Sequence, residues 1–186
     1  MDFKEETEKY VAFLRGINVG GHHKVPMAEL RETLEKLNLE NVITLLNSGN
    51  VIFDAVATDL ERLENTISET LEKTFGFPIP IIIRKAEIIQ QLFLHNPFQE
   101  ITITKDIRLY VSFLKKDTSS DLKLPWKSAD NSFIITEKRA QTIVSILDLS
   151  VAKTPKAMEV LEKSFGKDIT TRNWKTIERI IKKLPK

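Results

Sequence analysis

The residues best suited to chemistry lie in one short polar loop that runs from Arg15 to Lys24. This loop holds three of the six glycines and two of the three histidines in the chain. Glycine exposes its backbone N–H and accepts positive φ, so the Gly20-Gly21 pair before a helix predicts a concave group of N–H donors that binds an anion. The alternative is a simple turn with solvated charges. The residues expected to contact a ligand here are Arg15, Gly16, Asn18, Gly20, Gly21 and Lys24.

The spacing within this loop excludes several familiar sites. It is neither Gly-x-x-x-x-Gly-Lys-Ser/Thr nor Gly-x-Gly-x-x-Gly, so it predicts neither a P-loop nor a dinucleotide fingerprint. His22 and His23 are adjacent and have no third ligand nearby, and His95 lies on a different predicted helix; we therefore expect no metal. Either loop histidine would suit acid–base chemistry, but the sequence supplies no residue to orient its ring. The chain has no cysteine, which excludes disulfides and thiolate ligands.

Two further segments combine polar side chains with a turn or a helix start. Residues 47–50 (Asn-Ser-Gly-Asn) read as a hairpin turn, and the functional alternative is that Ser48 and Asn50 hydrogen-bond a ligand. At the head of the last helix, Arg172, Asn173 and Trp174 offer a fork of donors, an amide and a stacking plane. The structural alternative is that Asn173 caps that helix and Trp174 belongs to the core.

The elements that position the loop follow from hydrophobic spacing. The first half alternates strand and helix signals in the order β-α-β-β-α-β, which is the plan of a ferredoxin-like fold. One extra helix follows this unit. Thr58 and Glu61 have the spacing of a capping box, and Gly76 stands where a left-handed residue ends a helix. The expected elements are a strand at 10–15, a helix from Pro26, strands at 42–46 and 51–53, a helix at 58–76, a strand at 79–84 and a helix at 86–95.

The second half repeats parts of the first. Tyr-Val-Ala-Phe-Leu-Arg at 10–15 is echoed by Tyr-Val-Ser-Phe-Leu-Lys at 110–115, and Leu-Glu-Lys-Thr-Phe-Gly at 71–76 by Leu-Glu-Lys-Ser-Phe-Gly at 161–166. We therefore predict an α+β protein of two ferredoxin-like βαββαβ halves, at residues 8–97 and 106–184, that arose by internal duplication. The second half is expected to contain a weak segment at 117–128, strands at 132–137 and 141–147, a helix from Pro155 capped by Thr154, an extended stretch at 168–171 and a final helix bearing Trp174.

The two halves differ chemically. The second echo strand is followed by Lys116-Asp117-Thr118-Ser119-Ser120, without glycine, so we interpret the glycine loop as a feature that the fold itself does not require.

Composition sets the broad class. The 186 residues are 41% hydrophobic and 29% charged, which is ordinary for a globular protein. No apolar run approaches the roughly 20 residues that cross a bilayer, and the charged N-terminus does not look like a secretory signal, so a cytoplasmic protein without membrane contact is expected. A net charge of +2 is too small to indicate nucleic-acid binding by field strength alone.

Four segments together resemble the signature segments of the domain-of-unknown-function 1697 family, which consists mainly of bacterial cytosolic proteins. They are Leu-Arg-Gly-Ile-Asn-Val-Gly-Gly at 14–21, Lys-Val-Pro-Met-Ala-Glu-Leu-Arg at 24–31, Asn-Ser-Gly-Asn-Val-Ile-Phe at 47–53 and Thr-Arg-Asn-Trp at 171–174. The resemblance implies an α+β fold of ferredoxin-like character and implies no reaction, substrate or cofactor. The pair His22-His23 departs from the single histidine or other polar residue that such families often show.

The function that these patterns favour is the binding of a small anionic or phosphorylated ligand at the Arg15–Lys24 loop, with or without its transformation. One alternative is a nucleic-acid-binding module, and another is a homodimeric interaction protein without catalysis. The residues assign no catalytic role and no cofactor.

Overall fold

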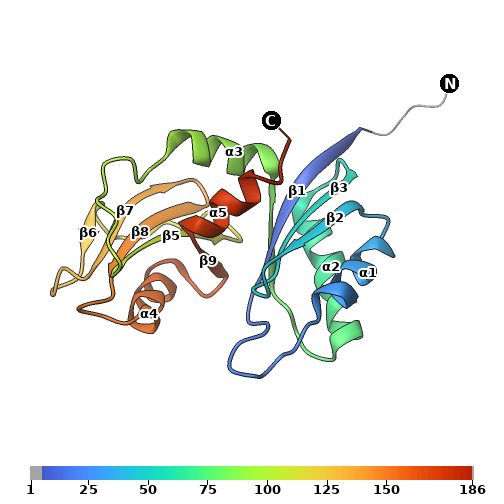
Figure 1. Cartoon of the computed structure of the whole chain (residues 1–186), viewed down its shortest axis with the longest axis horizontal. Coiled ribbons are helices and arrows are strands. Elements are labelled where there is room, and N and C mark those ends of the chain that lie inside the picture. Colours follow the sequence, from blue (N-terminus) through green and yellow to red (C-terminus); the bar gives the residue numbers. More distant parts are fainter. Residues whose placement is uncertain (1–5, 186) are drawn as a thin grey trace. The chain divides into compact units, whose positions relative to one another are not determined.

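The computed structural model describes residues 6–185, which form nine strands and five helices. The chain divides into two compact units, one of residues 6–94 with 179–185 and the other of residues 95–178 (Figure 1). Each unit contains one antiparallel sheet. The α+β class is therefore confirmed.

The first unit has the strand order of a ferredoxin-like fold. Its sheet runs β2-β3-β1-β4, and every neighbouring pair is antiparallel. With one helix after β1 and one after β3, this is the βαββαβ plan predicted from the sequence. Its elements are β1 (Thr7–Leu14), α1 (Met27–Glu35), β2 (Glu40–Leu45), β3 (Asn50–Val56), α2 (Leu60–Phe75) and β4 (Ile81–Lys85), followed by α3 (Ala86–His95).

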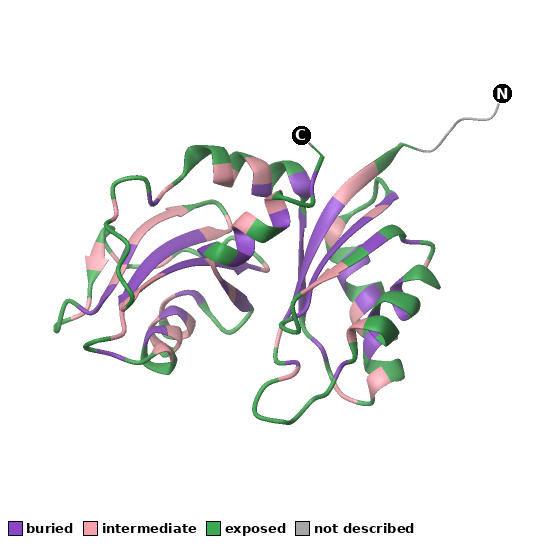
Figure 2. Cartoon of the chain, in the orientation of Figure 1, coloured by how far each residue is buried: buried purple, intermediate pink, exposed green. Residues whose placement is uncertain are grey.

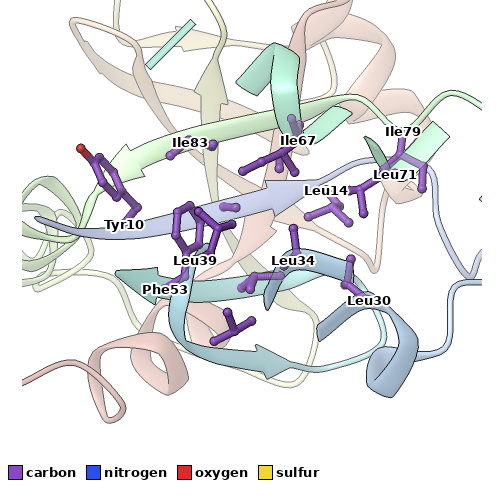
Figure 3. Close-up of a cluster of buried hydrophobic side chains, with 14 of the residues drawn as sticks. Tyr10, Leu14, Leu30, Leu34, Leu39, Phe53, Ile67, Leu71, Ile79 and Ile83 are labelled. Carbon is purple, nitrogen blue, oxygen red and sulfur yellow. The ribbon is translucent and has the colours of Figure 1, made fainter. Parts of the chain in front are cut away.

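The core of this unit lies between one face of the sheet and the helices α1 and α2 (Figure 3). Alternate residues of β1 (Tyr10, Ala12 and Leu14) point into it, as the two-residue period of a strand requires. Leu34 of α1 and Ile67 of α2 meet them there, each at most 1% exposed. The central strands are buried along most of their length (Figure 2), because the residues of β1 that face away from this core are buried as well.

The helix ends of the first unit confirm one capping prediction and correct two. Gly76 ends α2 with φ 80°, as its position predicted. The cap at the start of α2 is Asp59, whose side chain accepts from Arg62 N, so the expected Thr58 cap is wrong by one residue. Pro26 is the residue before α1, with ψ 130°, instead of its first helical residue.

The second unit has the same strand order but lacks one helix of the plan. Its sheet runs β6-β7-β8-β5-β9, so β7-β8-β5-β9 corresponds to β2-β3-β1-β4. Between β5 and β7 the described chain forms only the two-residue strand β6, and the helix that the βαββαβ plan places there is absent. The elements are β5 (Ile107–Leu114), β6 (Trp126–Lys127), β7 (Phe133–Arg139), β8 (Thr142–Asp148), α4 (Thr154–Phe165), β9 (Ile169–Asn173) and α5 (Trp174–Ile181).

Local hydrogen bonds of Asp130 fix the turn between β6 and β7. Asp130 accepts from the hydroxyls of Ser128 and Ser132, which also holds its pKa well below the usual range, and Lys156 pairs with its other oxygen at 2.9 Å. Side chains that bond their own neighbours in this way favour turns over helices. The duplication and the boundaries 8–97 and 106–184 stay predictions.

The core of the second unit lies between its sheet and α4. Leu161 and Phe165 of α4 pack with Tyr110 of β5, Ile135 of β7 and their neighbours. The expected cap Thr154 is instead the first residue of α4, which follows Lys153 without a side-chain cap. The Thr154 hydroxyl lies 3.1 Å from the hydroxyl of Tyr110, and that bond replaces the capping role.

Within residues 6–185, none of the helices combines the length and the apolar composition needed to span a membrane.

Candidate functional site

The glycine loop of the first unit folds as a miniature hairpin. Val19 and His22 form a β-bridge closed by His22 N donating to Val19 O at 3.1 Å. The two residues between them, Gly20 and Gly21, have φ 60° and 79°, and positive φ at both central positions is the condition of a type I′ turn. These φ values and the bridge indicate that the pair forms a tight turn. They do not indicate the concave anion nest that the sequence predicted.

Asn18 clamps the base of this hairpin. Its backbone has φ 55°, and its N–H donates to His23 O at 3.0 Å. Its side chain accepts from Val25 N at 2.8 Å and donates to Val25 O at 3.0 Å. The same amide also donates to Asn47 O at 2.8 Å. One half-buried side chain thus joins the loop to the residues before α1 and to the β2–β3 turn.

The β2–β3 turn lies directly against the loop. Gly49 O accepts from Leu14 N at 2.8 Å, and a Cβ on Gly49 would come within 2.7 Å of Ile17. Only glycine fits there, since its φ is also positive at 76°. Asn50 is fully buried and donates to Leu45 O and to the hydroxyl of Ser48. Of the two predicted ligand residues in this turn, Asn50 therefore shapes the turn, and Ser48 is exposed at the surface.

Basic and imidazole groups surround the loop. Lys24 and His22 are exposed and Arg15 is half-buried. His23 stacks on Phe77 with ring centroids 4.4 Å apart, and its Nδ1 lies 3.2 Å from Gly16 O. His23 is thus held in place, whereas the Lys24 and His22 side chains are available to a ligand.

The start of α1 adds a partial positive charge beside these groups. The first N–H groups of a helix have no helical partner, and Pro26 offers no side chain to cap them. Glu29 lies in the first turn and opposes an anion there. Within the described residues no cluster of three or more His, Cys, Asp or Glu side chains suits a metal ion.

The predicted corner Arg172–Trp174 belongs to the second unit, and its three side chains have local partners. The Arg172 guanidinium is buried and donates to Thr170 Oγ1 at 2.9 Å; burial lowers its pKa to about 10. Asn173 caps α5 by accepting from the N–H two residues on, at 3.0 Å. Trp174 is 6% exposed and packs edge-on against Phe98. Loop and turn come together in the first unit, and the corner belongs to the second unit.

Sequence reasoning missed the counterpart of Arg172 in the first unit. Arg84 of β4 is 5% exposed and pairs with Val11 in register, as Arg172 of β9 pairs with Val111. Burial lowers the pKa of Arg84 and the nearby Glu64 carboxylate opposes that shift. The sequence contains a pattern that could have identified Arg84. Ile-Ile-Ile-Arg-Lys at 81–85 and Ile-Thr-Thr-Arg-Asn at 169–173 both place an arginine at the fourth position of a strand that precedes a helix.

Comparison with known proteins places the chain in a family. The model of a family described as proteins of unknown function, DUF1697, matches residues 7–140. The chain belongs to this family. It also resembles the solved structure of a conserved bacterial protein from Streptococcus pneumoniae, with 26% identity and a TM-score of 0.67. That similarity covers 94% of this chain and 97% of the other. No curated protein matches the chain.

The family assignment confirms the resemblance seen in the sequence. The matched range includes the glycine loop and the β2–β3 turn and ends before Arg172. The family description assigns no function.

Proposed function

We propose that this DUF1697 protein binds a small anionic ligand, such as a phosphate ester, at the loop from Arg15 to Lys24. The observation that carries the proposal is the Asn18 clamp. Its three side-chain hydrogen bonds fix the loop beside the uncapped start of α1. A site held in its bound shape loses little conformational entropy on binding.

The donors in this proposal come from side chains and from the helix start. Lys24 and His22 supply exposed donors, and the first N–H groups of α1 supply a site that favours negative charge. Ser48, exposed on the adjoining turn, adds a hydroxyl. Gly20 and Gly21 shape the hairpin and contribute less than a nest would. A nest would bind the anion through backbone N–H groups alone. Without a nest, the affinity for the anion depends more on the Lys24 ammonium group.

The chain provides a matched test of this site. Pyrophosphate is titrated at constant ionic strength while the ring signals of the three histidines are followed by NMR. We expect saturable shifts for His22 and His23, with His95 unmoved. Lys24→Gln should raise the Kd about threefold to tenfold, in line with the loss of one hydrogen bond to a charged group.

Lys36→Gln is the control, because it removes the same charge at the opposite, C-terminal end of α1. Equal Kd values for the two lysine variants would mean that pyrophosphate responds only to net charge. That result would remove the proposed site.

Glu29 gives a test in the opposite direction. Its carboxylate lies in the first turn of α1 and repels an anion bound at that helix start. Glu29→Gln should therefore lower the Kd for pyrophosphate about two- to fivefold. An unchanged Kd would place the anion away from α1.

The nucleic-acid alternative has less support in the first unit. Base stacking on a ferredoxin-like sheet uses exposed aromatic side chains on the face away from the helices. Phe13 of β1 points to that face and is fully buried. A single-stranded DNA titration at two salt concentrations tests the alternative, because phosphate-driven binding weakens steeply as salt rises.

A further inference from the structure

A polar cavity lies within the second unit, whereas the glycine loop belongs to the first. It has a volume of about 340 Å³, within the range of small-ligand pockets. One wall is formed by His95, the last residue of α3, and by Gln99 and Glu100 of the turn that follows. The other wall is β7, with Thr136 and Glu137. Pro97 and Ile101 add apolar surface.

A β-bulge in β7 decides which side chain faces this cavity. Ile135 pairs with Ser145, but Glu137 pairs with Val144, so β7 has one extra residue at this point. Without the bulge Thr136 would lie opposite Val144 and Glu137 would point toward the α4 side of the sheet. The Thr136 hydroxyl donates to Val144 O at 3.2 Å, which satisfies the carbonyl beside the irregularity. Bulges often re-aim side chains next to functional sites.

The re-aimed carboxylate orients a histidine. Glu137 Oε1 lies 3.2 Å from His95 Nε2, and Glu137 Oε2 lies 3.3 Å from Arg139 Nε. The bond to Nε2 fixes the imidazole ring, and in the neutral tautomer that donates to Glu137 the Nδ1 atom is an acceptor. His95 is thus held by a carboxylate, whereas His23 of the glycine loop lies against a backbone oxygen, Gly16 O.

The charges around the cavity select the ligand. Glu100 and Glu137 both line it, and His95 ends α3, whose C-terminal carbonyls favour positive charge. Arg139 offsets one of the two carboxylates. We infer that the cavity binds a small molecule with a primary ammonium group. The ammonium group donates hydrogen bonds to His95, Glu137 and Glu100. Pro97 and Ile101 contact the carbon chain of the same molecule.

Three probes of equal length separate this inference from general stickiness. 1,4-Diaminobutane, 1,4-butanediol and succinate are titrated separately at constant ionic strength, and the His95 ring signals are followed by NMR. The diamine should produce saturable shifts with a Kd of about 1 mM, typical of so small a ligand. The diol should bind at least about tenfold more weakly, because it lacks the charge, and succinate should leave His95 unmoved.

Two variants test the assignment to this cavity. Glu100→Gln removes an exposed carboxylate that lines the cavity and should raise the diamine Kd about threefold or more. Glu159→Gln removes an exposed carboxylate on α4, outside the lining, and should leave the Kd unchanged. No saturable shift of His95 below about 50 mM diamine would overturn the inference, as would equal affinities for diamine and diol or equal effects of the two variants.

The inference and the proposed function fail separately. Pyrophosphate reports through His22 and His23 and the diamine through His95, so one spectrum of the intact chain distinguishes the two sites.

Discussion

Replacing Asn18 tests whether the clamp fixes the loop. Asn18→Gly keeps a residue that accepts φ 55° but removes all three side-chain hydrogen bonds. At about 0.5–1.5 kcal/mol for each of the three net bonds, the free energy of unfolding should fall by about 1.5–4.5 kcal/mol. Asn18→Ala should cost about 1 kcal/mol more, because alanine tolerates the left-handed conformation less well.

Asn38→Gly is the matched control. Asn38 also has positive φ, at 59°, and it is exposed just after α1. Glycine there should change the free energy of unfolding by less than about 0.5 kcal/mol.

The assay is urea unfolding followed by far-UV circular dichroism, together with hydrogen exchange of residues 14–25. Tryptophan fluorescence is unsuited, since Trp126 and Trp174 both belong to the second unit. Exchange of the loop amides should accelerate in Asn18→Gly and not in Asn38→Gly. If Asn18→Gly unfolds within about 0.5 kcal/mol of the wild type and its loop exchange is unchanged, the clamp does not hold the loop.

Three further variants or titrations test other parts of the structure. Gly49→Ala should lower the free energy of unfolding by about 2–3 kcal/mol in urea, because the added Cβ would come within 2.7 Å of a neighbouring side chain at φ 76°; an unchanged midpoint would contradict that contact. Ser145→Ala should leave the free energy of unfolding unchanged or raise it by up to about 1 kcal/mol, because Ser145 Oγ is buried without a hydrogen-bond partner among the described residues. Ser112→Ala breaks a 2.7 Å hydrogen bond between two hydroxyls and should lower the free energy of unfolding. Burial and the hydrogen bond to Glu8 raise the pKa of Tyr10 to about 12. The free energy of unfolding should therefore fall between about pH 10 and 12, because the phenol of the unfolded chain loses its proton first. An ultraviolet titration in which Tyr10 ionises near its model value of pH 10 would refute this.

Local signals predicted the elements of this chain well. Residues 86–95 form a helix with the bounds that the sequence indicated, and Gly76 ends α2 as expected. Helix starts were less certain, because Thr58 and Asp59 are both good caps and only the path of the chain selects one. The helix missing from residues 115–132 shows the limit of arguing from a repeat. Its absence also weakens the comparison that singled out the glycine loop, because the second unit lacks the helix as well as the loop before it.

The candidate site was predictable as a segment and less so as a mechanism. The sequence shows that Asn18 carries an amide, but its partner Asn47 is 29 residues away and contributes only a backbone oxygen. His95 and Glu137 are 42 residues apart in the sequence, and their contact depends on a β-bulge that the residue types of β7 do not predict. Buried arginines such as Arg84 look like surface residues in a sequence, because arginine is seldom buried.

The central claim is that the clamped loop beside α1 is an anion site, and a crystal structure with pyrophosphate tests it most directly. We predict pyrophosphate density in contact with the Lys24 ammonium group and the first N–H groups of α1, with the hairpin at 19–22 unchanged. Density for pyrophosphate elsewhere, with none at this loop under saturating conditions, would contradict the account.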